Sequence, residues 1–490
     1  MVRTDHARIL NPSDPQKPGE PMTQPPESIT RMLKSQGQEH LLDFYASLDE
    51  QQQESLVQQL EMINFQQMQK LIGQEHHEDS TSTDSIQPPV IYPTLPEDHQ
   101  RYRDIGVEMI RAGKVAPFTV AGGQGTRLGW NGPKGAFPAT VLTGKPLFRV
   151  FAEQILAIES RYDVSLTWYI MTSPINDDDT RAFFTDNNHF GLDPQQVVFF
   201  QQGVLPSIDG DGRMLLAQKD HVAVNPDGHG GSLLALAVSG SLEHMRARGI
   251  EQISYFQVDN PLVHVLDPLF IGLHVAAKDS SGQISSKMIP KRDPGEKVGV
   301  LCMVDGKTRV IEYSDIDPGI AAETDENGRL RLRAGSIGIH MMSVEFVEHL
   351  TRNPDDFALP FHMAHKKVPY IDLDSGELVQ PEQPNATKFE AFVFDAIPLA
   401  DSSIVYETVR VEEFAPIKNA SGEDSPESSH QLQSDRAGLW LEAAGCTVQR
   451  DGDGHVTSRI EIKASTAIEA GDLRDVELPE SISDGEEVLL

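Results

Sequence analysis

Cysteine is nearly absent from this 490-residue chain: Cys302 and Cys446 are far apart and form no Cys-x-x-Cys pair. This scarcity argues against a disulfide scaffold or a cysteine-ligated metal site, and it predicts reduced thiols. The sequence also has no run of about 18 apolar residues and no apolar signal-peptide segment near its start. We therefore expect a cytoplasmic protein without a membrane partner.

Basic residues are also scarce. The 41 Lys and Arg residues are outnumbered by 74 Asp and Glu residues, which gives a formal charge of −33. This balance excludes a nucleic-acid partner, because nucleic-acid phosphates require a basic surface. For the same reason, any phosphate-binding site in this chain has to concentrate its few cations in one place.

A glycine-rich turn is the strongest local signal. The apolar run Val115–Val120 is typical of a buried strand, and the turn follows it directly. Without a Cβ, glycines allow a backbone to bend sharply and to approach a ligand, and successive N–H groups can then converge on an anion. The turn therefore predicts a phosphate-binding loop, with a plain strand–helix connection as the alternative. Its glycines are Gly122, Gly123 and Gly125.

Two cations beside this turn strengthen the phosphate hypothesis. Arg127 and Lys134 follow the glycines, and an arginine can hold a phosphate through two parallel hydrogen bonds. Two commoner glycine loops do not fit. A Walker loop requires Lys-Ser/Thr where Thr126-Arg127 stands, and the dinucleotide fingerprint requires a glycine where Leu128 stands.

Composition divides the chain into four expected parts. Residues 1–27 are proline-rich and predict a disordered lead-in, and residues 28–97 predict a helical segment and a linker. The pair His76-His77 in that linker is expected to be inert. Residues 98–380 form the expected main domain, and residues 381–490 form the expected β-rich C-terminal domain with an acidic tail.

Strand-like and helix-like stretches alternate in the main domain. Such alternation predicts an α/β fold with a mostly parallel sheet, helices on both faces and a binding crevice at the carboxyl ends of the strands. The expected strands are residues 115–120, 165–171, 197–201 and 253–258, and the expected helices are residues 148–158 and 233–248. Further on, we expect strands at 409–411 and 455–463, a polar loop at 421–431 and a solvated tail at 469–487.

Several short polar strings supply candidates for phosphate chemistry, which depends on charge neutralisation and alignment rather than on covalent help from the protein. Asp259 ends an expected strand, and a carboxylate at that place could hold Mg²⁺ or serve as a turn cap. A second glycine-rich turn, residues 225–231, precedes a helix. Lys388 and Lys418, taken singly, have the pattern of surface lysines.

Together these strings resemble one family, the UDP-N-acetylhexosamine pyrophosphorylases of the wider UDP-sugar pyrophosphorylase group. The resemblance extends over roughly residues 100–420, in the family's order, through AGGQGTRLG, PKG, QQGVLP, PDGHGG, VDN, VGV, VIEYS, KKVPYID, FVFD and IKN. It implies a Rossmann-like, GT-A-like nucleotidyltransferase fold, with residues 98–380 as the catalytic domain. It also implies a uridylyltransferase that uses UTP, a sugar-1-phosphate and Mg²⁺; the oligomeric state stays open.

The resemblance implies a role for each matched residue. For the nucleotide, the glycine turn with Thr126 and Arg127 would embrace the triphosphate, Lys134 would meet the β- and γ-phosphates, Gln202 and Gly228 would contact the uracil, and Lys388 would meet phosphate. Asp259 would serve the metal. On the sugar side, Glu312 and Tyr313 would hold hydroxyls, and Lys418 would bind the sugar phosphate.

Two positions depart from the acetylhexosamine pattern. His229 stands where PDGNGG has Asn, and the resulting Gly-His-Gly is similar to the UDP-glucose pyrophosphorylases. Ser336 stands where AGNI has Asn. Both positions belong to the sugar side. Because most of the strings, especially VIEYS and KKVPYID, still resemble the acetylhexosamine group, we expect N-acetylglucosamine-1-phosphate as the substrate, with glucose- or galactose-1-phosphate as the alternative. A protein that binds a UDP-sugar without turning it over would be expected to lose Arg127, Lys134 or Asp259, and all three are present.

Overall fold

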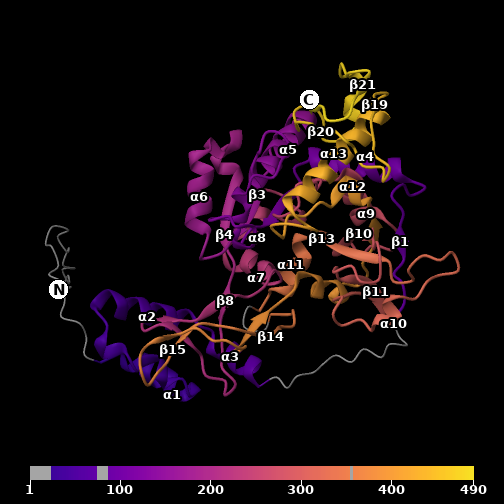
Figure 1. Ribbon diagram of the computed structural model, residues 1–490. Helices are drawn as coiled ribbons and strands as arrows, with labels where there is room; N and C mark the ends of the chain where they lie inside the picture. Colours follow the sequence, from indigo (N-terminus) through magenta and orange to yellow (C-terminus); the bar gives the residue numbers. More distant parts are fainter. Residues whose placement is uncertain (1–23, 74–85, 354–356) are drawn as a thin grey trace, which may run out of the picture. The chain divides into compact units, whose positions relative to one another are not determined.

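The computed structural model describes residues 24–73, 86–353 and 357–490. Most of the expected lead-in and the pair His76-His77 lie outside these residues. The described chain forms two compact units (Figure 1). Unit one comprises residues 24–73, 204–225 and 363–389, and unit two comprises the remaining described residues.

Unit one combines helices with short two-stranded ladders. Its three segments are joined by hydrogen bonds, since the side-chain amide of Gln38 donates to Gly212 O and accepts from Met214 N, and Ile208 pairs with Thr387. The helices are α1 Glu27–Gln36, α2 Glu50–Met62 and α3 Phe65–Ile72. The ladders pair β5 Val204–Pro206 with β8 Val224–Pro226, β6 Leu216–Gln218 with β7 His221–Val222, β14 His362–Lys366 with β17 Ala386–Glu390, and β15 Tyr370–Ile371 with β16 Leu378–Val379.

A large mixed sheet organises unit two and confirms the predicted fold class. Neighbouring strands β4, β3, β2 and β9 run parallel, β13 is antiparallel to both β9 and β10, and β10, β18 and β1 are again parallel. Antiparallel β11 and β12 extend the sheet from β13. The bounds are β1 Ile91–Tyr92, β2 Val115–Val120, β3 Trp168–Thr172, β4 Val197–Gln201, β9 Gln252–Gln257, β10 Ile284–Pro290, β11 Val300–Val304, β12 Lys307–Ile311, β13 Ala334–Ser343 and β18 Val405–Glu407.

Helices cover both faces of this sheet, as predicted. Side chains alternate along β3, so that Trp168 and Ile170 face one core while Tyr169 and Met171 face the other. The first core includes α4 His99–Arg111, α5 Leu147–Tyr162, α6 Asp177–Asp186 and α9 Pro268–Ala276. The second includes α7 Gly231–Val238, α8 Ser241–Ala247 and α11 Val344–Leu350. In Figure 1, α6 runs beside β4, which agrees with their packing.

Three sequence predictions about local structure are wrong. The expected helix 233–248 is broken at Gly240, whose φ of 75° separates α7 from α8. The expected strand 409–411 lies largely in α12 Arg410–Glu413 instead, where Glu413 is held by a buried ion pair. The expected loop 421–431 contains the start of α13 Pro426–Ala443, because Ser425 caps the helix and a proline occupies its first position.

The acidic tail is solvated along most of its length, as expected, although Leu473 and Ile482 are buried. Leu473 is fully buried, and Ile482 packs in the same apolar cluster as α13. Glu469 forms ion pairs with Arg103 and Arg161, so part of its charge is neutralised within unit two. Four short strands complete this part of unit two: β19 Thr447–Val448, β20 Arg459–Glu461, β21 Ser481–Ile482 and β22 Glu487–Leu489. Helix α10 Pro318–Ala321 lies earlier in the unit. No helix in the described part of the chain combines the length and the apolar character of a bilayer span.

Candidate active site

The glycine turn and Asp259 lie at the same edge of the large sheet. Strands β2 and β9 are parallel neighbours whose last residues, Val120 and Gln257, are in register, so the segments that follow them emerge together. The ammonium of Lys134 lies 3.2 Å from Asp259 Oδ2 and connects the two segments. This contact confirms that the predicted phosphate loop and the predicted metal ligand share one edge.

Gln202 determines the shape of the glycine turn. A Cβ added at Gly122 would lie 2.2 Å from Gln202 Oε1, whereas a Cβ at Gly123 would meet no atom within 4 Å. Gly122 therefore makes room for a protein side chain, and Gly123 faces open space. Beyond the turn, Thr126–Leu128 form a single 3₁₀ turn. A long helix therefore does not follow directly, so no helix N-terminus adds to the turn.

Asn176 supports the turn through hydrogen bonds to its carbonyl groups, and this role was not predicted from the sequence. Its side chain is fully buried, and its amide donates to Ala121 O at 2.9 Å and to Gly123 O at 3.3 Å. Its oxygen accepts hydrogen bonds from the backbone N–H and the hydroxyl of Ser173. The sequence offers one signal for this role: a polar Asn stands shortly after β3, at the same edge of the sheet as the glycine turn.

The cations near the turn differ in their surroundings. Thr126 and Arg127 are exposed, and within the described residues Arg127 has no ion pair, so its guanidinium is available to an anion. Lys134 is largely buried against Asp259. Although burial opposes ionisation of Asp259, the charges of Lys134 and Lys418 hold the pKa of that carboxyl below its ordinary value. Asp259 is therefore an anion at neutral pH.

The second glycine turn is fastened to residues 390–393. A Cβ at Gly228, whose φ is 85°, would lie 2.4 Å from Ala391 O. Ala391 N donates to Asp227 O and Gly230 N donates to Ala391 O, both at 2.8 Å. The Asp227 carboxyl packs against Gly203 and Gly231, Oδ1 has no partner within the described residues, and burial raises its pKa to about 7.

One hollow of about 810 Å³ brings together most of the residues predicted for the sugar and the metal. Lys418 is bound loosely there: its ammonium lies 3.6 Å from Asp424 Oδ2 and over the Phe414 ring. The predicted residues in the lining are His229, Asp259, Glu312, Ser336 and Lys418. Those that the sequence reasoning missed include Gln257, Asn260, Lys297, His340 and Phe394.

His229 presents a defined hydrogen-bonding face. The backbone N–H of Val393 donates to His229 Nδ1 at 3.1 Å, so the ring proton is on Nε2. Burial lowers the pKa of His229 to about 4, which keeps the ring neutral. Phe392 and Phe394 pack against the ring with centroid distances of 5.3 and 5.7 Å. His229 is therefore a fixed donor at this hollow.

The remaining predicted residues are placed as follows. Glu312 lines the hollow, and burial together with Asp315 and Asp395 raises its pKa. Tyr313 is 45% exposed and is not part of the lining. Lys388 belongs to unit one, on β17. The sugar role of Tyr313 and the phosphate role of Lys388 stay predictions.

The donor set suits Mg²⁺ shared with a phosphate substrate. Within the described residues, no group of three or more His, Cys, Asp or Glu side chains could hold a metal ion. Mg²⁺ commonly takes one or two carboxylates and completes its shell with phosphate oxygens and water. The single ionised Asp259 beside a phosphate-type loop fits that pattern, whereas a site built from protein ligands alone does not.

Comparisons with known proteins agree with this geometry. Residues 62–449 match the family described as UTP–glucose-1-phosphate uridylyltransferase. The chain is 33% identical over 461 residues to UDP-N-acetylglucosamine diphosphorylase 2 of Arabidopsis thaliana, covering 90% of this chain and 88% of that protein. It is 36% identical over 442 residues to UDP-N-acetylhexosamine pyrophosphorylase-like protein 1 of Homo sapiens, covering 86% of each.

A solved structure extends the similarity to the fold. The uridine diphosphate N-acetylglucosamine pyrophosphorylase from Trypanosoma brucei superposes with a TM-score of 0.76 at 26% identity, covering 93% of this chain and 97% of that one. The similarity spans nearly the full length of both chains.

Proposed function

The chain belongs to the UTP–glucose-1-phosphate uridylyltransferase family, and we propose that it joins UTP and a sugar-1-phosphate into a UDP-sugar and pyrophosphate. The preferred substrate in this proposal is N-acetylglucosamine-1-phosphate. The observation that carries the proposal is the meeting of Lys134 and Asp259 at 3.2 Å beside the glycine turn, with Lys418 in the same hollow. Phosphoryl transfer requires such a concentration of charge.

UTP would bind at the carboxyl end of β2. The N–H groups around Gly123, together with Arg127 and Lys134, would hold the triphosphate, and Gln202 and Gly228 would contact the uracil. Gly123 faces open space, and Arg127 has no ion pair within the described residues, which suits both to ligand contact.

The reaction is a single displacement. An oxygen of the sugar phosphate attacks the α-phosphorus of UTP, the bond from that phosphorus to the β-phosphate oxygen breaks, and pyrophosphate leaves along the glycine turn. Lys418 would hold the attacking phosphate and align it, and Lys134 would stabilise charge on the leaving group. Mg²⁺, held by Asp259 together with phosphate oxygens, would supply further charge neutralisation.

The sugar assignment depends on the hollow and on the names of the relatives. Three relatives are named for N-acetylglucosamine or N-acetylhexosamine. The fixed Nε2–H of His229 is a donor, and the carbonyl oxygen of an N-acetyl group is an acceptor of the matching kind. Glu312 and Tyr313 would hold sugar hydroxyls, and Ser336 leaves space near the acetyl group.

Glucose- or galactose-1-phosphate is the second candidate, because the Gly-His-Gly turn favours it. We place the reaction in the cytoplasm, where the two buried free thiols of Cys302 and Cys446 would stay reduced. The deciding experiment measures pyrophosphate release from UTP with N-acetylglucosamine-, glucose- and galactose-1-phosphate. Release with none of them would refute the enzyme assignment and favour a protein that only binds a UDP-sugar. A clear preference for glucose-1-phosphate would refute the sugar assignment alone.

A further inference from the structure

Lys287 is a charged residue in the interior of the large sheet. Its side chain is 1% exposed, and it lies in β10 where the ladder with β13 is interrupted by a bulge between Ser286 and Met288. A bulge redirects a side chain out of the regular alternation of a strand. The ammonium lies over the rings of Phe270 and Tyr406, at 5.3 and 5.8 Å from their centroids.

Two carboxylates surround this ammonium. Asp267 Oδ2 accepts a hydrogen bond from Lys287 Nζ at 2.7 Å, and both oxygens of Glu413 accept at 2.6–2.7 Å. Glu413 is itself 1% exposed, and it accepts further bonds from the Thr408 hydroxyl and from His264 N. The position of Glu413 is therefore determined by three donor groups, which supply four hydrogen bonds, rather than by solvent.

Glu413 is connected to the active-site edge through Asn260. The Asn260 amide donates to Glu413 O at 2.6 Å, and its oxygen accepts from Ala415 N at 3.0 Å. Ile417 N then donates to Asp259 O at 2.9 Å. The segment 413–418, which ends in Lys418, is thus paired with the segment that carries Asp259.

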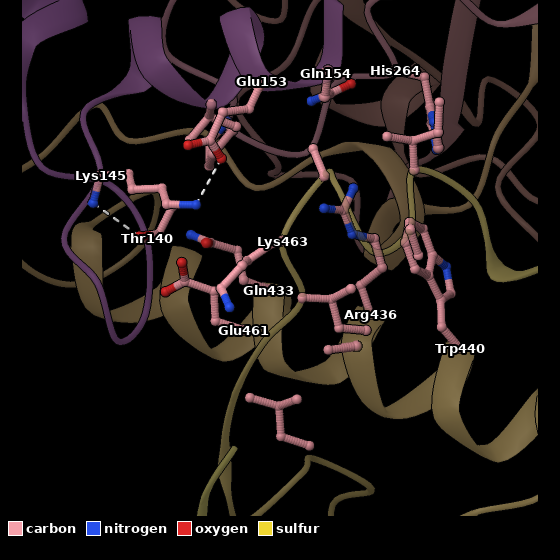
Figure 2. A pocket seen from close by; sticks show the side chains of 18 residues that line it. Thr140, Lys145, Glu153, Gln154, His264, Gln433, Arg436, Trp440, Glu461 and Lys463 are labelled. Atoms are coloured by element: carbon pink, nitrogen blue, oxygen red, sulfur yellow. Dashed lines mark hydrogen bonds and ion pairs between the residues drawn. The ribbon is translucent and has the colours of Figure 1, made fainter. Parts of the chain in front are cut away.

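Helix α13 holds the same two segments independently. Arg436 Nη1 donates to Leu262 O at 3.1 Å and to Glu412 O at 3.3 Å, and Trp440 Nε1 donates to a Glu412 carboxylate oxygen at 2.9 Å. Figure 2 shows Arg436 and Trp440 projecting from this helix into a second hollow of unit two, and the guanidinium lies 4.9 Å from the Trp440 ring centroid. Residues 262–267 and residues 412–413 are therefore bound to two separate buried cations, Lys287 and Arg436.

We infer that Lys287 is a positioning residue for the site: through Glu413 and Asn260 it fixes where Asp259 and Lys418 stand at the edge of the sheet. The inference rests on the proposed function, which gives Asp259 and Lys418 their roles toward metal and phosphate. Lys287 touches neither of them directly, so its effect is to hold their backbone segments in register. Partners that orient ligands in this way typically change metal affinity or activity by about 10- to 100-fold when removed.

The test uses Glu413→Gln, Lys287→Met and Lys287→Arg in the full chain. Glu413→Gln keeps the shape but weakens the pairing, so the KM for the sugar phosphate and the Mg²⁺ concentration for half-maximal rate should each rise about 10-fold or more. Calorimetry supplies a readout independent of turnover, in which the gain in UTP affinity on adding Mg²⁺ should shrink. Lys287→Arg, which retains the charge, should retain more of both properties than Lys287→Met.

Glu461→Gln is the matched control. Glu461 is also a buried carboxylate of unit two, but its hydrogen bonds come from Leu142 N, Thr143 N and the Thr143 hydroxyl. It should lower Tm without changing KM or the Mg²⁺ requirement. If Lys287→Met does not fold, Glu413→Gln decides alone. Wild-type KM, Mg²⁺ requirement and calorimetric gain in Glu413→Gln would overturn the inference, whereas a wild-type protein that releases no pyrophosphate would overturn the proposed function instead.

Discussion

The side-chain amide of Gln202 occupies the space that a Cβ on residue 122 would need. The two residues come from the ends of different strands, β4 and β2, and the clash distance to Gln202 Oε1 would be 2.2 Å. The glycine at position 122 therefore leaves room for the Gln202 side chain, which a larger residue there would displace before any nucleotide binds. Its neighbour Gly123 has no such constraint.

Gly122→Ala and Gly123→Ala should consequently fail in different ways. Gly122→Ala forces Gln202 to move, so both Tm and UTP affinity should fall, the affinity by about 10-fold or more because the proposed contact of Gln202 with the uracil is lost. Gly123→Ala should keep the wild-type Tm and lose only UTP affinity. Thermal melts and UTP titrations check this. Equal Tm values for the two variants would show that Gln202 relaxes freely.

Arg127→Ala and Lys134→Ala should both reduce turnover by about 100-fold or more, because each removes a cation from a developing phosphate charge. Their effects on stability should differ. Arg127 is exposed, so its loss should leave Tm unchanged, whereas loss of Lys134 leaves the largely buried Asp259 without its ion pair and should lower Tm. Steady-state kinetics and melts on the same preparations test both statements. Near wild-type rates for both variants would contradict the phosphate site.

Asp259→Asn should raise the metal requirement. The amide keeps the shape but removes the charge that attracts Mg²⁺, so activity should fall and recover in part at raised Mg²⁺ or Mn²⁺. Rates measured across a Mg²⁺ titration provide the check. Full activity of the variant at low Mg²⁺ would show that Asp259 acts only through its contact with Lys134.

Asp227 should make the protein less stable as pH rises. Its pKa in the folded chain is about 7, above its value of about 4 in an unfolded chain, so the folded state binds the extra proton between those values. The contribution of protonated Asp227 to the free energy of unfolding is complete below pH 4. It is lost as pH rises to 7, and the free energy of unfolding falls by about 1.4 kcal/mol per pH unit within that window. Asp227→Asn lacks this loss, so the variant should gain stability over wild type from pH 4 to 7 and keep a constant advantage above it. Denaturant unfolding of both proteins at several pH values measures the difference.

The double variant His229→Asn with Ser336→Asn should shift kcat/KM toward N-acetylglucosamine-1-phosphate over glucose-1-phosphate. Asn at 229 offers a donor and an acceptor, whereas the bond from Val393 N leaves His229 with a donor alone. A pocket that accommodates one extra group discriminates by about 10- to 200-fold, so wild type should use both sugars to different extents. An unchanged ratio in the double variant would show that these positions do not set the sugar.

The sequence was sufficient to predict which segments meet at the edge of the sheet, because the signals for these segments are local in the chain. The run Val115–Val120 matches β2 residue for residue, and residues 197–201 match β4, since buried parallel strands are short apolar runs bounded by turns. Asp259 was placed at the same edge as the glycine turn by the rule for parallel strands. Its contact with Lys134 follows from that placement.

The supporting residues could not be found in this way, because their roles depend on contacts distant in the chain. Asn176 binds carbonyls more than 50 residues earlier, and Lys287 pairs with Glu413 126 residues later. The segment 409–411 has the composition of a strand, yet residues 410–413 form a short helix whose last residue, Glu413, is paired with the distant Lys287. The tail 469–487 is highly charged and mostly exposed, yet Leu473 and Ile482 pack in the same apolar cluster as α13.

The division of unit one into three stretches has a consequence for synthesis on the ribosome. Gln38 bonds to Gly212, and Ile208 pairs with Thr387, so unit one as a whole cannot complete its contacts until the segment that ends at residue 389 has been translated. At about 5–20 residues per second, this delay after residue 73 is roughly 15 to 60 s. We therefore expect the folding of unit one during synthesis to depend on chaperones far more than the folding of a contiguous domain of the same size would.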